Sequence, residues 1–400
     1  MTYEDALAEL YALTPRGIEP GLERVREALR RAGDPQRALR VVHVAGTNGK
    51  GSVSAMVATG LAAAGQRVAL YTSPHLASLT ERMRVLGGEA ITQDDVARTW
   101  ASLHEALFGA GAPRVTFFEA LTVLALALFR EREVELAVLE VGLGGRLDAT
   151  NVIERPLACA ITRIGLDHQY LLGDDLASIA TEKAGILRAG VPAVLAPQRP
   201  EAQAVLEEIA SRIGAPIVPL APMMDLHPRL RGAHQQENAR IAATVLSVLG
   251  ERGVPTDARA ALEEVEWPGR LERVGAFLLD AAHNEDGAAS LAAFLASEPR
   301  RRRVLLFGAM ADKDWRAMLA TLRPHVDALV FAAPPLSRAE RPENLAAAFG
   351  GEPALSVERA IERARELAGD GEVIVAGSIY LMGEVRTRLL GLPRDPPIAM

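Results

Sequence analysis

The sequence contains a single cysteine, Cys159, among its 400 residues. One thiol excludes an intramolecular disulfide and any zinc site built from several cysteines. Cys159 lies in the apolar run of residues 157–161, so we predict that it is a small core residue rather than a reactive group.

Long hydrophobic runs and an excess of positive charge are also missing. The longest nearly apolar stretch, residues 120–129, is too short to span a bilayer. The first residues lack the basic and apolar regions of a signal peptide, so we expect a cytoplasmic protein with no membrane partner. The net charge of -7 argues against a nucleic-acid partner. One basic run, residues 300–303, precedes an expected strand and is predicted to be a solvated loop.

The composition that remains is that of a globular protein, with 49% hydrophobic and 24% charged residues. A chain of 400 residues predicts two domains. Expected strands alternate with expected helices, which predicts an α/β fold with a mostly parallel sheet covered on both faces. The pattern restarts near Trp267-Pro-Gly-Arg270. We therefore place the domains at residues 1–266 and 267–400, with residues 267–269 as a candidate hinge.

The expected elements follow from runs of apolar residues and their spacing. In the first domain, strands are expected at residues 41–44, 67–72, 135–141, 157–162, 191–196 and 216–220. Helices are expected there at residues 2–13, 21–32, 92–108, 116–131, 175–188, 201–213 and 234–249, with a further one after residue 50. In the second domain, strands are expected at residues 275–281, 303–308, 328–332 and 372–377, and helices at 285–296, 314–322 and 379–390.

A glycine-rich turn at residues 46–52 follows the first expected strand and precedes a helix. Strand, glycine turn, lysine, hydroxyl and helix form the arrangement that binds a nucleotide phosphate, because turn N–H groups and the helix N-terminus face the anion. The strict pattern G-x-x-x-x-G-K-[ST] fails twice, since Val44 replaces its first glycine and Gly51 separates Lys50 from Ser52. An ordinary strand–turn–helix corner is the alternative.

Ser73, Glu140 and His168 each lie at the end of an expected strand. Ligands in open α/β sheets sit at the carboxyl ends of strands. Oxygen ligands with one imidazole suit magnesium or manganese beside a nucleotide. In the alternative, Glu140 forms a salt bridge with Arg146 and His168 caps a loop.

Four further features of the sequence have a structural interpretation, a functional one, or both. Lys183, taken alone, is expected to be a surface lysine paired with a neighbouring acid. Asp280 in Asp-Ala-Ala-His-Asn284 either binds a nucleotide or caps the next helix, where Asn284 is a good N-cap. Residues 142–145 lack the G-x-G-x-x-G spacing, and we reject them as a dinucleotide motif. Phe117 and Phe118 are core residues by default, although Glu119 beside them points to a role at the substrate.

Taken together, these segments resemble the folylpolyglutamate synthase/dihydrofolate synthase family, a branch of the Mur ligase superfamily. The matching segments follow the family order along nearly the whole chain, at residues 43–52, 72–76, 81–84, 117–119, 140–151, 167–168, 182–186, 235–238, 267–270, 280–284, 312–314 and 377–381. The extra glycine at position 51 is the form of the P-loop that this family has. The implied fold is a P-loop Mur-ligase-like central domain with a smaller Rossmann-like α/β C-terminal domain that carries glutamate ligation.

The resemblance also implies roles for individual residues. ATP would be bound by Gly49, Lys50, Gly51, Ser52, Asn238, Arg270 and Asp280, the last three acting across a domain interface. Two magnesium sites are implied, with Ser73, Glu140, His168 and a carbamylated Lys183 as ligands. Lys50, Lys183 and His283 would be the catalytic residues. The pterin-bearing substrate would lie along Phe117, Phe118, Glu119, Leu147, Asp148 and Ala149.

The implied activity is ATP-driven amide formation. A substrate carboxylate would become an acyl phosphate, and the amine of L-glutamate would displace the phosphate. We expect a monomer that uses ATP, L-glutamate and either dihydropteroate or a reduced folate, and we predict both activities. A Mur ligase with a UDP-sugar acceptor and a P-loop switch without ligase chemistry are the rival interpretations. Asp175 and Arg240 depart from the residues usual in the family, and Arg240 puts the packing near Asn238 in doubt.

Overall fold

The chain folds into two compact units, and each is described on its own. The computed structural model describes residues 1–222 and 228–396. The first unit comprises Met1–His75, Leu79–Arg229 and Gln235–Glu266, and the second comprises Leu76–Ser78, Leu230–His234 and the chain from Trp267 onward. Within the described ranges, no helix is long and apolar enough to cross a membrane.

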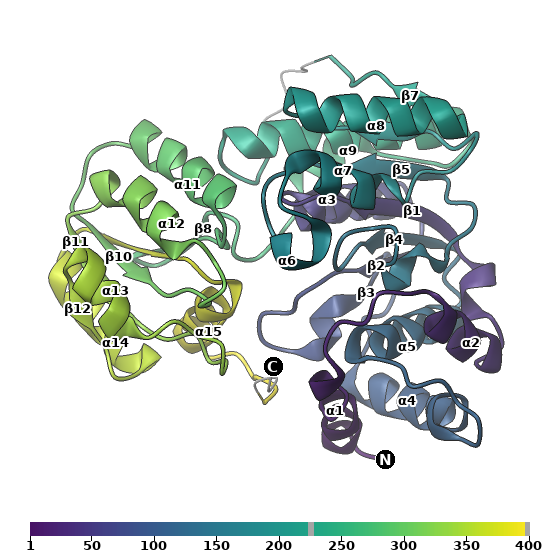
Figure 1. Ribbon diagram of the computed structural model, residues 1–400, viewed down its shortest axis with the longest axis horizontal. Coiled ribbons are helices and arrows are strands. Elements are labelled where there is room, and N and C mark those ends of the chain that lie inside the picture. Colours follow the sequence, from purple (N-terminus) through teal and green to yellow (C-terminus); the bar gives the residue numbers. More distant parts are fainter. Residues whose placement is uncertain (223–227, 397–400) are drawn as a thin grey trace. The chain divides into compact units, whose positions relative to one another are not determined.

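The first unit is built on a seven-stranded sheet of order β3-β2-β4-β1-β5-β6-β7 (Figure 1). Its strands are β1 (Arg40–Ala45), β2 (Val68–Tyr71), β3 (Met83–Leu86), β4 (Leu136–Glu140), β5 (Ala158–Ile161), β6 (Ala193–Leu195) and β7 (Ile217–Val218). All neighbours pair in parallel except β3, which is antiparallel to β2. The prediction of a mostly parallel sheet is confirmed. The strand β3 has no counterpart among the expected strands, because only alternate residues of this short edge strand are buried.

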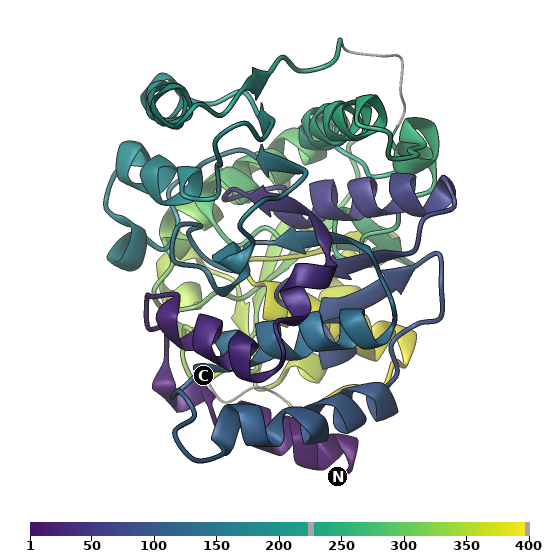
Figure 2. The same cartoon turned by 90° about the vertical axis from the view of Figure 1, so that its right-hand side faces the viewer.

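Helices connect these strands and pack on the sheet and on one another (Figure 2). They are α1 (Tyr3–Tyr11), α2 (Glu23–Arg31), α3 (Lys50–Ala63), α4 (Gln93–Phe108), α5 (Phe117–Glu131), α6 (Gln169–Leu172), α7 (Leu176–Ala184), α8 (Pro200–Ile213), α9 (Ala233–Glu251) and α10 (Ala258–Glu263). Short 3-10 helices in this unit cover Thr14–Arg16, Pro35–Ala38, Leu79–Arg82 and Ala149–Val152. Three of the helices begin with a capping box, in which a threonine and an acid three residues later bond each other's backbone N–H: Thr2 and Asp5, Thr92 and Asp95, and Thr116 and Glu119.

The core of the first unit is formed where fully buried strands meet apolar helix faces. Every residue of β4 is buried, as are five of the six in β1, as expected for parallel strands covered on both faces. The helix α5 is apolar nearly all round and buried over most of its length. Cys159 is fully buried in β5, and this confirms its predicted place in the core.

The second unit has a six-stranded sheet of order β12-β11-β10-β13-β9-β8. Its strands are β8 (Glu272–Val274), β9 (Phe277–Leu279), β10 (Arg303–Phe307), β11 (Ala328–Phe331), β12 (Glu352–Pro353) and β13 (Glu372–Ala376). Its helices are α11 (Glu285–Ser297), α12 (Trp315–Leu322), α13 (Pro342–Phe349), α14 (Val357–Ala368) and α15 (Ile379–Leu390), with a 3-10 turn at Arg323–His325. The strand expected at residues 275–281 is confirmed as the shorter β9, but the preceding strand β8 was not expected. The chain forms the antiparallel pair β8–β9, because Gly275 adopts φ 56° and turns it back.

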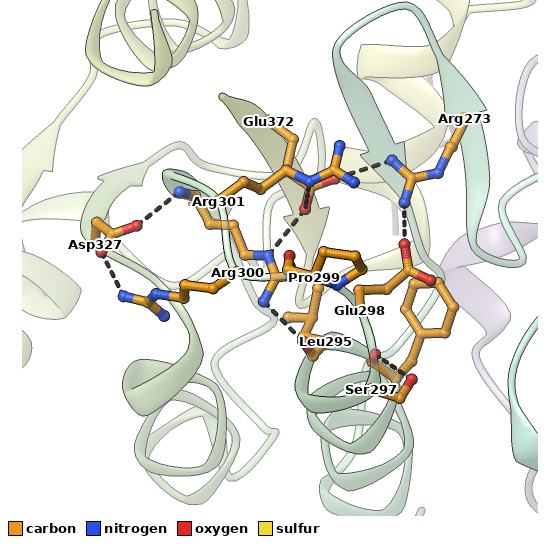
Figure 3. A network of polar contacts seen from close by, with 11 residues as sticks. Arg273, Leu295, Ser297, Glu298, Pro299, Arg300, Arg301, Asp327 and Glu372 are labelled. Atoms are coloured by element: carbon orange, nitrogen blue, oxygen red, sulfur yellow. Dashed lines mark hydrogen bonds and ion pairs between the residues drawn. The ribbon is translucent and has the colours of Figure 1, made fainter. Parts of the chain in front are cut away.

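The basic run at residues 300–303 is only partly the solvated loop that its composition predicts. Arg303 is the first residue of β10 and is 2% exposed. Its Nε donates to Glu372 Oε1 at 2.9 Å, and its Nη1 donates to the carbonyl oxygen of Leu295 at 2.7 Å. Arg273 Nη1 donates to the other oxygen of Glu372 at 3.0 Å (Figure 3). Arg303 is therefore buried because its charge is matched there.

Candidate functional site

Four neighbouring parallel strands of the first unit bring the predicted residues to one edge of the sheet. The strands β2, β4, β1 and β5 are adjacent, and β1 pairs with β4 and β5 in a register that aligns Val44 with Glu140 and Ala45 with Ile161. Their carboxyl ends lead into the segments at Ser73, at Glu140, at the glycine turn and at His168. In an open parallel sheet this edge is where ligands bind.

Close packing fixes the glycine turn after β1. Gly46 has φ 145°, and a Cβ there would lie 1.8 Å from Thr162 Oγ1. Gly49 has φ 92°, and a Cβ there would lie 2.3 Å from Asn238 Oδ1. The backbone N–H groups of Thr47 and Asn48 both donate to the carbonyl oxygen of Arg163. The turn therefore requires glycine at positions where the chain passes close to its neighbours.

The helix α3 begins directly after this loop, and its first turn contributes its N-terminal backbone N–H groups there. Lys50, Gly51 and Ser52 are its first three residues, and N–H groups at this place have no partner within a helix. Such a helix start attracts anions. Lys50 Nζ donates to the carbonyl oxygen of Thr47 at 3.1 Å, so the ammonium lies over the loop. These positions match a phosphate-binding turn.

Ser52 and Asn238 are linked through a residue that the sequence analysis did not single out as a site residue. Gln235 Nε2 donates to Ser52 Oγ at 3.2 Å, and Asn238 Nδ2 donates to Gln235 Oε1 at 2.9 Å. All three side chains are buried. The start of α9 is therefore tied to the start of α3. A glutamine three residues before Asn238, one helical turn away, was the available signal.

Ser73 and Glu140 lie next to each other after β2 and β4. The backbone N–H of Ser73 donates to Glu140 Oε2 at 3.2 Å, and the peptide bond from Ser73 to Pro74 is cis. The predicted alternative, a salt bridge from Glu140 to Arg146, is wrong. Arg146 instead pairs with Glu182, at 2.8 Å. A buried carboxylate beside a serine is a donor set that fits a hard cation.

His168 follows β5 and precedes the one-turn helix α6. It has φ 52°, and its N–H donates to Asp167 Oδ1 at 2.8 Å. Its side chain makes no cap hydrogen bond at the start of α6, and its Nε2 lies 3.8 Å from Asp167 Oδ1. In the described ranges, no three His, Cys, Asp or Glu side chains gather closely enough to hold a metal. The predicted set contains only two such residues, Glu140 and His168, and relies on Ser73 and a modified Lys183 for the others.

Lys183 is not the surface lysine that its neighbours in sequence suggest. It is 4% exposed, and its Nζ donates to the carbonyl oxygen of Gly46 at 2.9 Å. Its pKa is lowered from 10.5 to about 7, mainly by burial and also by the charge of Lys50, while Asp167 and Asp148 act in the opposite direction. A lysine with this pKa is in part a neutral amine near neutral pH. The expectation of a surface lysine is wrong, because α7 turns this residue towards the glycine turn.

The segment between β4 and the 3-10 helix at Ala149–Val152 is organised by Asp148. Its Oδ2 accepts from the N–H of Leu143 at 2.9 Å, and its Oδ1 accepts from the N–H and the hydroxyl of Thr150 at 2.9 and 2.5 Å. Burial raises the pKa of Asp148, and these hydrogen bonds lower it. A Cβ on Gly142 would lie 2.4 Å from Phe118. The glycines of this segment therefore serve close packing.

Phe117, Phe118 and Glu119 begin α5. Phe117 is buried against Tyr11, whereas the partly exposed Phe118 packs beside Tyr71 and over Gly142. Glu119 caps the helix and receives Arg24, with Nη2 at 2.9 Å from Oε1 and Nε at 3.2 Å from Oε2. Both oxygens of Glu119 are therefore engaged within the first unit. Arg24 was missed because it lies 95 residues earlier in the chain.

The second unit carries Arg270, Asp280 and His283 in one group of loops. Asp280 follows β9, and its oxygens accept from the N–H groups of Leu271 at 3.1 Å and Ala282 at 3.0 Å. Burial raises its pKa, and Arg270 is among the cations that lower it. His283 Nδ1 lies 2.9 Å from the carbonyl oxygen of Ala281. The helix cap is Asn284, which accepts from the N–H of Gly287, so Asp280 shapes its own loop instead.

The two departures from the family pattern have plain structural accounts. Asp175 is the N-cap of α7 and accepts from the N–H of Ser178 at 2.7 Å, as a threonine could. Arg240 Nε donates to the carbonyl oxygen of Ala221 at 2.7 Å, so it points to another segment and leaves Asn238 bound to Gln235.

Comparisons with known proteins agree with this geometry. Residues 269–379 match the family described as Mur ligase, glutamate ligase domain. A protein of Bacillus subtilis named dihydrofolate synthase/folylpolyglutamate synthase is 33% identical, over 97% of this chain and 99% of that protein. A relative in Haloferax volcanii, named a probable bifunctional folylpolyglutamate synthase/dihydropteroate synthase, is 35% identical over 97% of this chain. The chain spans about half of that relative, 50% of its length.

Solved structures resemble the fold over nearly its full length. Escherichia coli FolC in complex with DHPP and ADP has a TM-score of 0.88 and 31% identity, with 98% of each chain covered. The bifunctional folylpolyglutamate synthase/dihydrofolate synthase from Yersinia pestis, complexed with AMPPNP and a Mn ion, has a TM-score of 0.86 and 32% identity, with 98% of each chain covered. The two-domain α/β fold is thereby confirmed. The chain belongs to the folylpolyglutamate synthase/dihydrofolate synthase family of ATP-dependent ligases.

Proposed function

We propose that this chain adds L-glutamate both to dihydropteroate and to reduced folylglutamates, with ATP and a divalent cation. The observation that carries the proposal is the strand-end arrangement of the first unit. A phosphate-binding turn, the Ser73–Glu140 pair and a buried lysine converge on the ends of neighbouring strands. The relatives named for both activities and the structures with ADP, DHPP and AMPPNP support the choice of substrates.

The proposed chemistry has two steps in which atoms balance. The acceptor carboxylate oxygen bonds to the γ-phosphorus of ATP as the bond from that phosphorus to ADP breaks. The glutamate amine then bonds to the acyl carbon, the carbon–oxygen bond to phosphate breaks, and the amine loses a proton. Lys50 and the N-terminus of α3 offset negative charge on the transferring phosphoryl group, which is the main route to catalysis in such reactions.

The residues at the strand ends have distinct proposed tasks. Ser73, Glu140 and His168 would hold magnesium, which supplies charge neutralisation at the phosphates. Lys183 is proposed to be carbamylated, since a buried amine with a pKa near 7 is neutral often enough to attack carbon dioxide. The ammonium first loses one proton, and the neutral amine then bonds to the carbon of carbon dioxide as one carbon–oxygen π bond opens and the nitrogen loses a second proton. The product is a carbamate anion, which would offer an oxygen donor to a second cation.

The remaining predicted residues would contact nucleotide or acceptor. Gly49 to Ser52 and Asn238 in the first unit, with Arg270 and Asp280 in the second, are proposed for ATP, and His283 for the catalytic loop of that unit. Phe118 and residues 147–149 are proposed to contact the pterin. Phe117 and Glu119 are buried or fully engaged, so we propose that they support Phe118. We further propose that residues 1–266 carry the P-loop for ATP, and that residues 267–400 carry glutamate ligation in addition to the ATP contacts of Arg270 and Asp280.

The test is release of phosphate by the purified protein with MgATP and L-glutamate. Phosphate is expected with dihydropteroate and with tetrahydrofolate as acceptor, and not when glutamate or acceptor is omitted. Release with tetrahydrofolate alone reduces the proposal to polyglutamation. A rate of phosphate release that is the same with and without glutamate and either acceptor identifies a P-loop switch instead. Phosphate release that requires a UDP-sugar acceptor identifies a cell-wall ligase.

A further inference from the structure

A fully buried histidine stands in the strand that leads into the glycine turn. His43 lies in the middle of β1, between valines, and has no exposed surface. An aliphatic side chain would fill such a place in a parallel strand without the cost of burying polar nitrogens. Burial lowers the pKa of His43 to about 3, so the ring is neutral. A polar group buried in this way needs a reason.

The partner of His43 is Thr150, which lies 107 residues later in the chain. His43 Nε2 is 2.8 Å from Thr150 Oγ1, and both side chains are fully buried. The same hydroxyl is 2.5 Å from Asp148 Oδ1, and Thr150 N–H also donates to that oxygen. His43, Thr150 and Asp148 thus form one chain of hydrogen bonds, which we call the β1 relay.

The direction of the protons in the β1 relay follows from the hydrogen-bonding capacity of each group. An ionised Asp148 only accepts, so the single hydroxyl proton of Thr150 goes to it. The oxygen of Thr150 then accepts, and the proton of the imidazole must be on Nε2. Among the described residues, no hydrogen-bond partner reaches Nδ1 of His43. The neutral ring of His43 therefore donates its single N–H, on Nε2, to Thr150 Oγ1.

The β1 relay connects two parts of the site. His43 is three residues before Gly46, where the phosphate-binding turn begins. Asp148 holds the N–H of Leu143 and sits within residues 147–149, the segment proposed to contact the pterin. We infer that His43 and Thr150 are positioning residues for the acceptor substrate, because they fix Asp148 and its segment to the strand that carries the ATP turn. The inference rests on the proposed function and deepens it.

The inference predicts a separation between the two substrates. Thr150→Val keeps the shape of the side chain and removes the hydroxyl, which leaves Asp148 without one charge-assisted hydrogen bond. Loss of such a bond raises the KM for dihydropteroate or tetrahydrofolate by about 10-fold or more. The KM for ATP and kcat change by less than about 3-fold, since neither the phosphate turn nor the reacting groups lose a contact. Thr150→Ser restores the hydroxyl and is expected to behave like the wild type.

Two further variants separate positioning from a loss of stability. Thr99→Val is the matched control, because Thr99 is also fully buried and its hydroxyl donates to a carboxylate, that of Glu131, at 2.6 Å. It is expected to lower stability without changing either KM. His43→Leu removes the donor at the far end of the β1 relay. Its effect on the acceptor KM is expected to add little to that of Thr150→Val in the double variant.

The KM values of these variants decide whether the β1 relay positions the acceptor. A raised acceptor KM in Thr150→Val, with rescue in Thr150→Ser and non-additivity with His43→Leu, supports the inference. An acceptor KM unchanged from the wild type, or equal rises in the KM of ATP and acceptor, overturns it while the proposed function stands. If the wild type itself releases no phosphate with either acceptor, the proposed function fails, and the inference fails with it.

Discussion

Each unit buries a group of charged side chains, and the two groups lie at opposite ends of the strands in their own sheets. In the first unit, Glu140, Asp148 and Lys183 gather where parallel strands end. In the second unit, Arg303 and Glu372 pair where the neighbouring strands β10 and β13 begin. Ligand sites of parallel sheets occur at the carboxyl ends.

The two groups also differ in how the charge is matched. Glu372 receives Arg303 and Arg273, and two more bonds join the guanidinium of Arg303 to the carbonyl oxygens of Leu295 and Pro299. Lys183 donates to a neutral carbonyl oxygen, and burial lowers its pKa to about 7. A buried charge bonded to its opposite holds a fold together. A buried charge with a displaced pKa marks a group that is prepared for chemistry.

The largest effect is expected from Glu372→Gln. The substitution keeps the shape and removes the charge, so Arg303 and Arg273 lose their shared partner at a site that is 3% exposed. Breaking a buried pair in this way costs about 3–5 kcal/mol. Urea unfolding measures the loss, and kcat of the folded protein at low temperature should stay unchanged. Glu366→Gln on the exposed face of α14 is the control. If Glu372→Gln lowers the free energy of unfolding no more than this control does, Glu372 is not a stabilising buried ion-pair partner.

The next effect is expected from Lys183→Ala, on activity. Loss of the proposed carbamate, and with it one proposed donor to the cation, should lower kcat by about 10²–10³-fold, the cost of removing one preorganised group that stabilises the transition state. Lys183→Arg is the matched variant, because it keeps a cation and cannot carry a carbamate. Equal losses in both variants support the carbamate. Activity that survives in Lys183→Arg shows that only a positive charge is needed there.

A smaller effect is expected from Lys183→Met, which should raise the free energy of unfolding in buffer free of carbon dioxide. The pKa of Lys183 is about 7 in the folded protein and 10.5 ordinarily, so the unfolded chain binds more protons between these values. The stability of the wild type therefore rises with pH across this window and carries its full penalty below pH 7. The variant should be more stable at pH 7, by roughly 1–4 kcal/mol. Urea unfolding at pH 7 and pH 10 should show the gap narrowing, and a constant gap would refute the buried cation.

Features of the two units that depend on neighbouring residues could be predicted from the sequence, and features that depend on distant residues could not. The strand β1, its glycine turn and α3 were predictable because their signals are local, within residues 40–63. The burial of Arg303 depends on Glu372, 69 residues away, and the β1 relay joins residues 107 apart. A basic run and a lone histidine in a strand say nothing of such partners. The helices α13 and α14 were missed for other reasons. The helix α13 has only eight residues, too few for a clear helical repeat, and α14 is rich in charged residues.

The smallest effect is expected at the rim of the second group, from Arg300→Ala. Arg300 Nη2 bonds Asp327 Oδ1 at 2.7 Å, but its side chain is 65% exposed. Water solvates such a pair nearly as well as the partners do, so its loss costs about 0.2–1 kcal/mol and shrinks further in high salt. The backbone N–H of Arg303 still binds Asp327 at 2.7 Å, which keeps that carboxylate in place. Urea unfolding at low and high salt measures the difference. If Arg300→Ala lowered the free energy of unfolding nearly as much as Glu372→Gln, the comparison would fail. The exposed and the buried arginines of residues 300–303 would then contribute equally to stability.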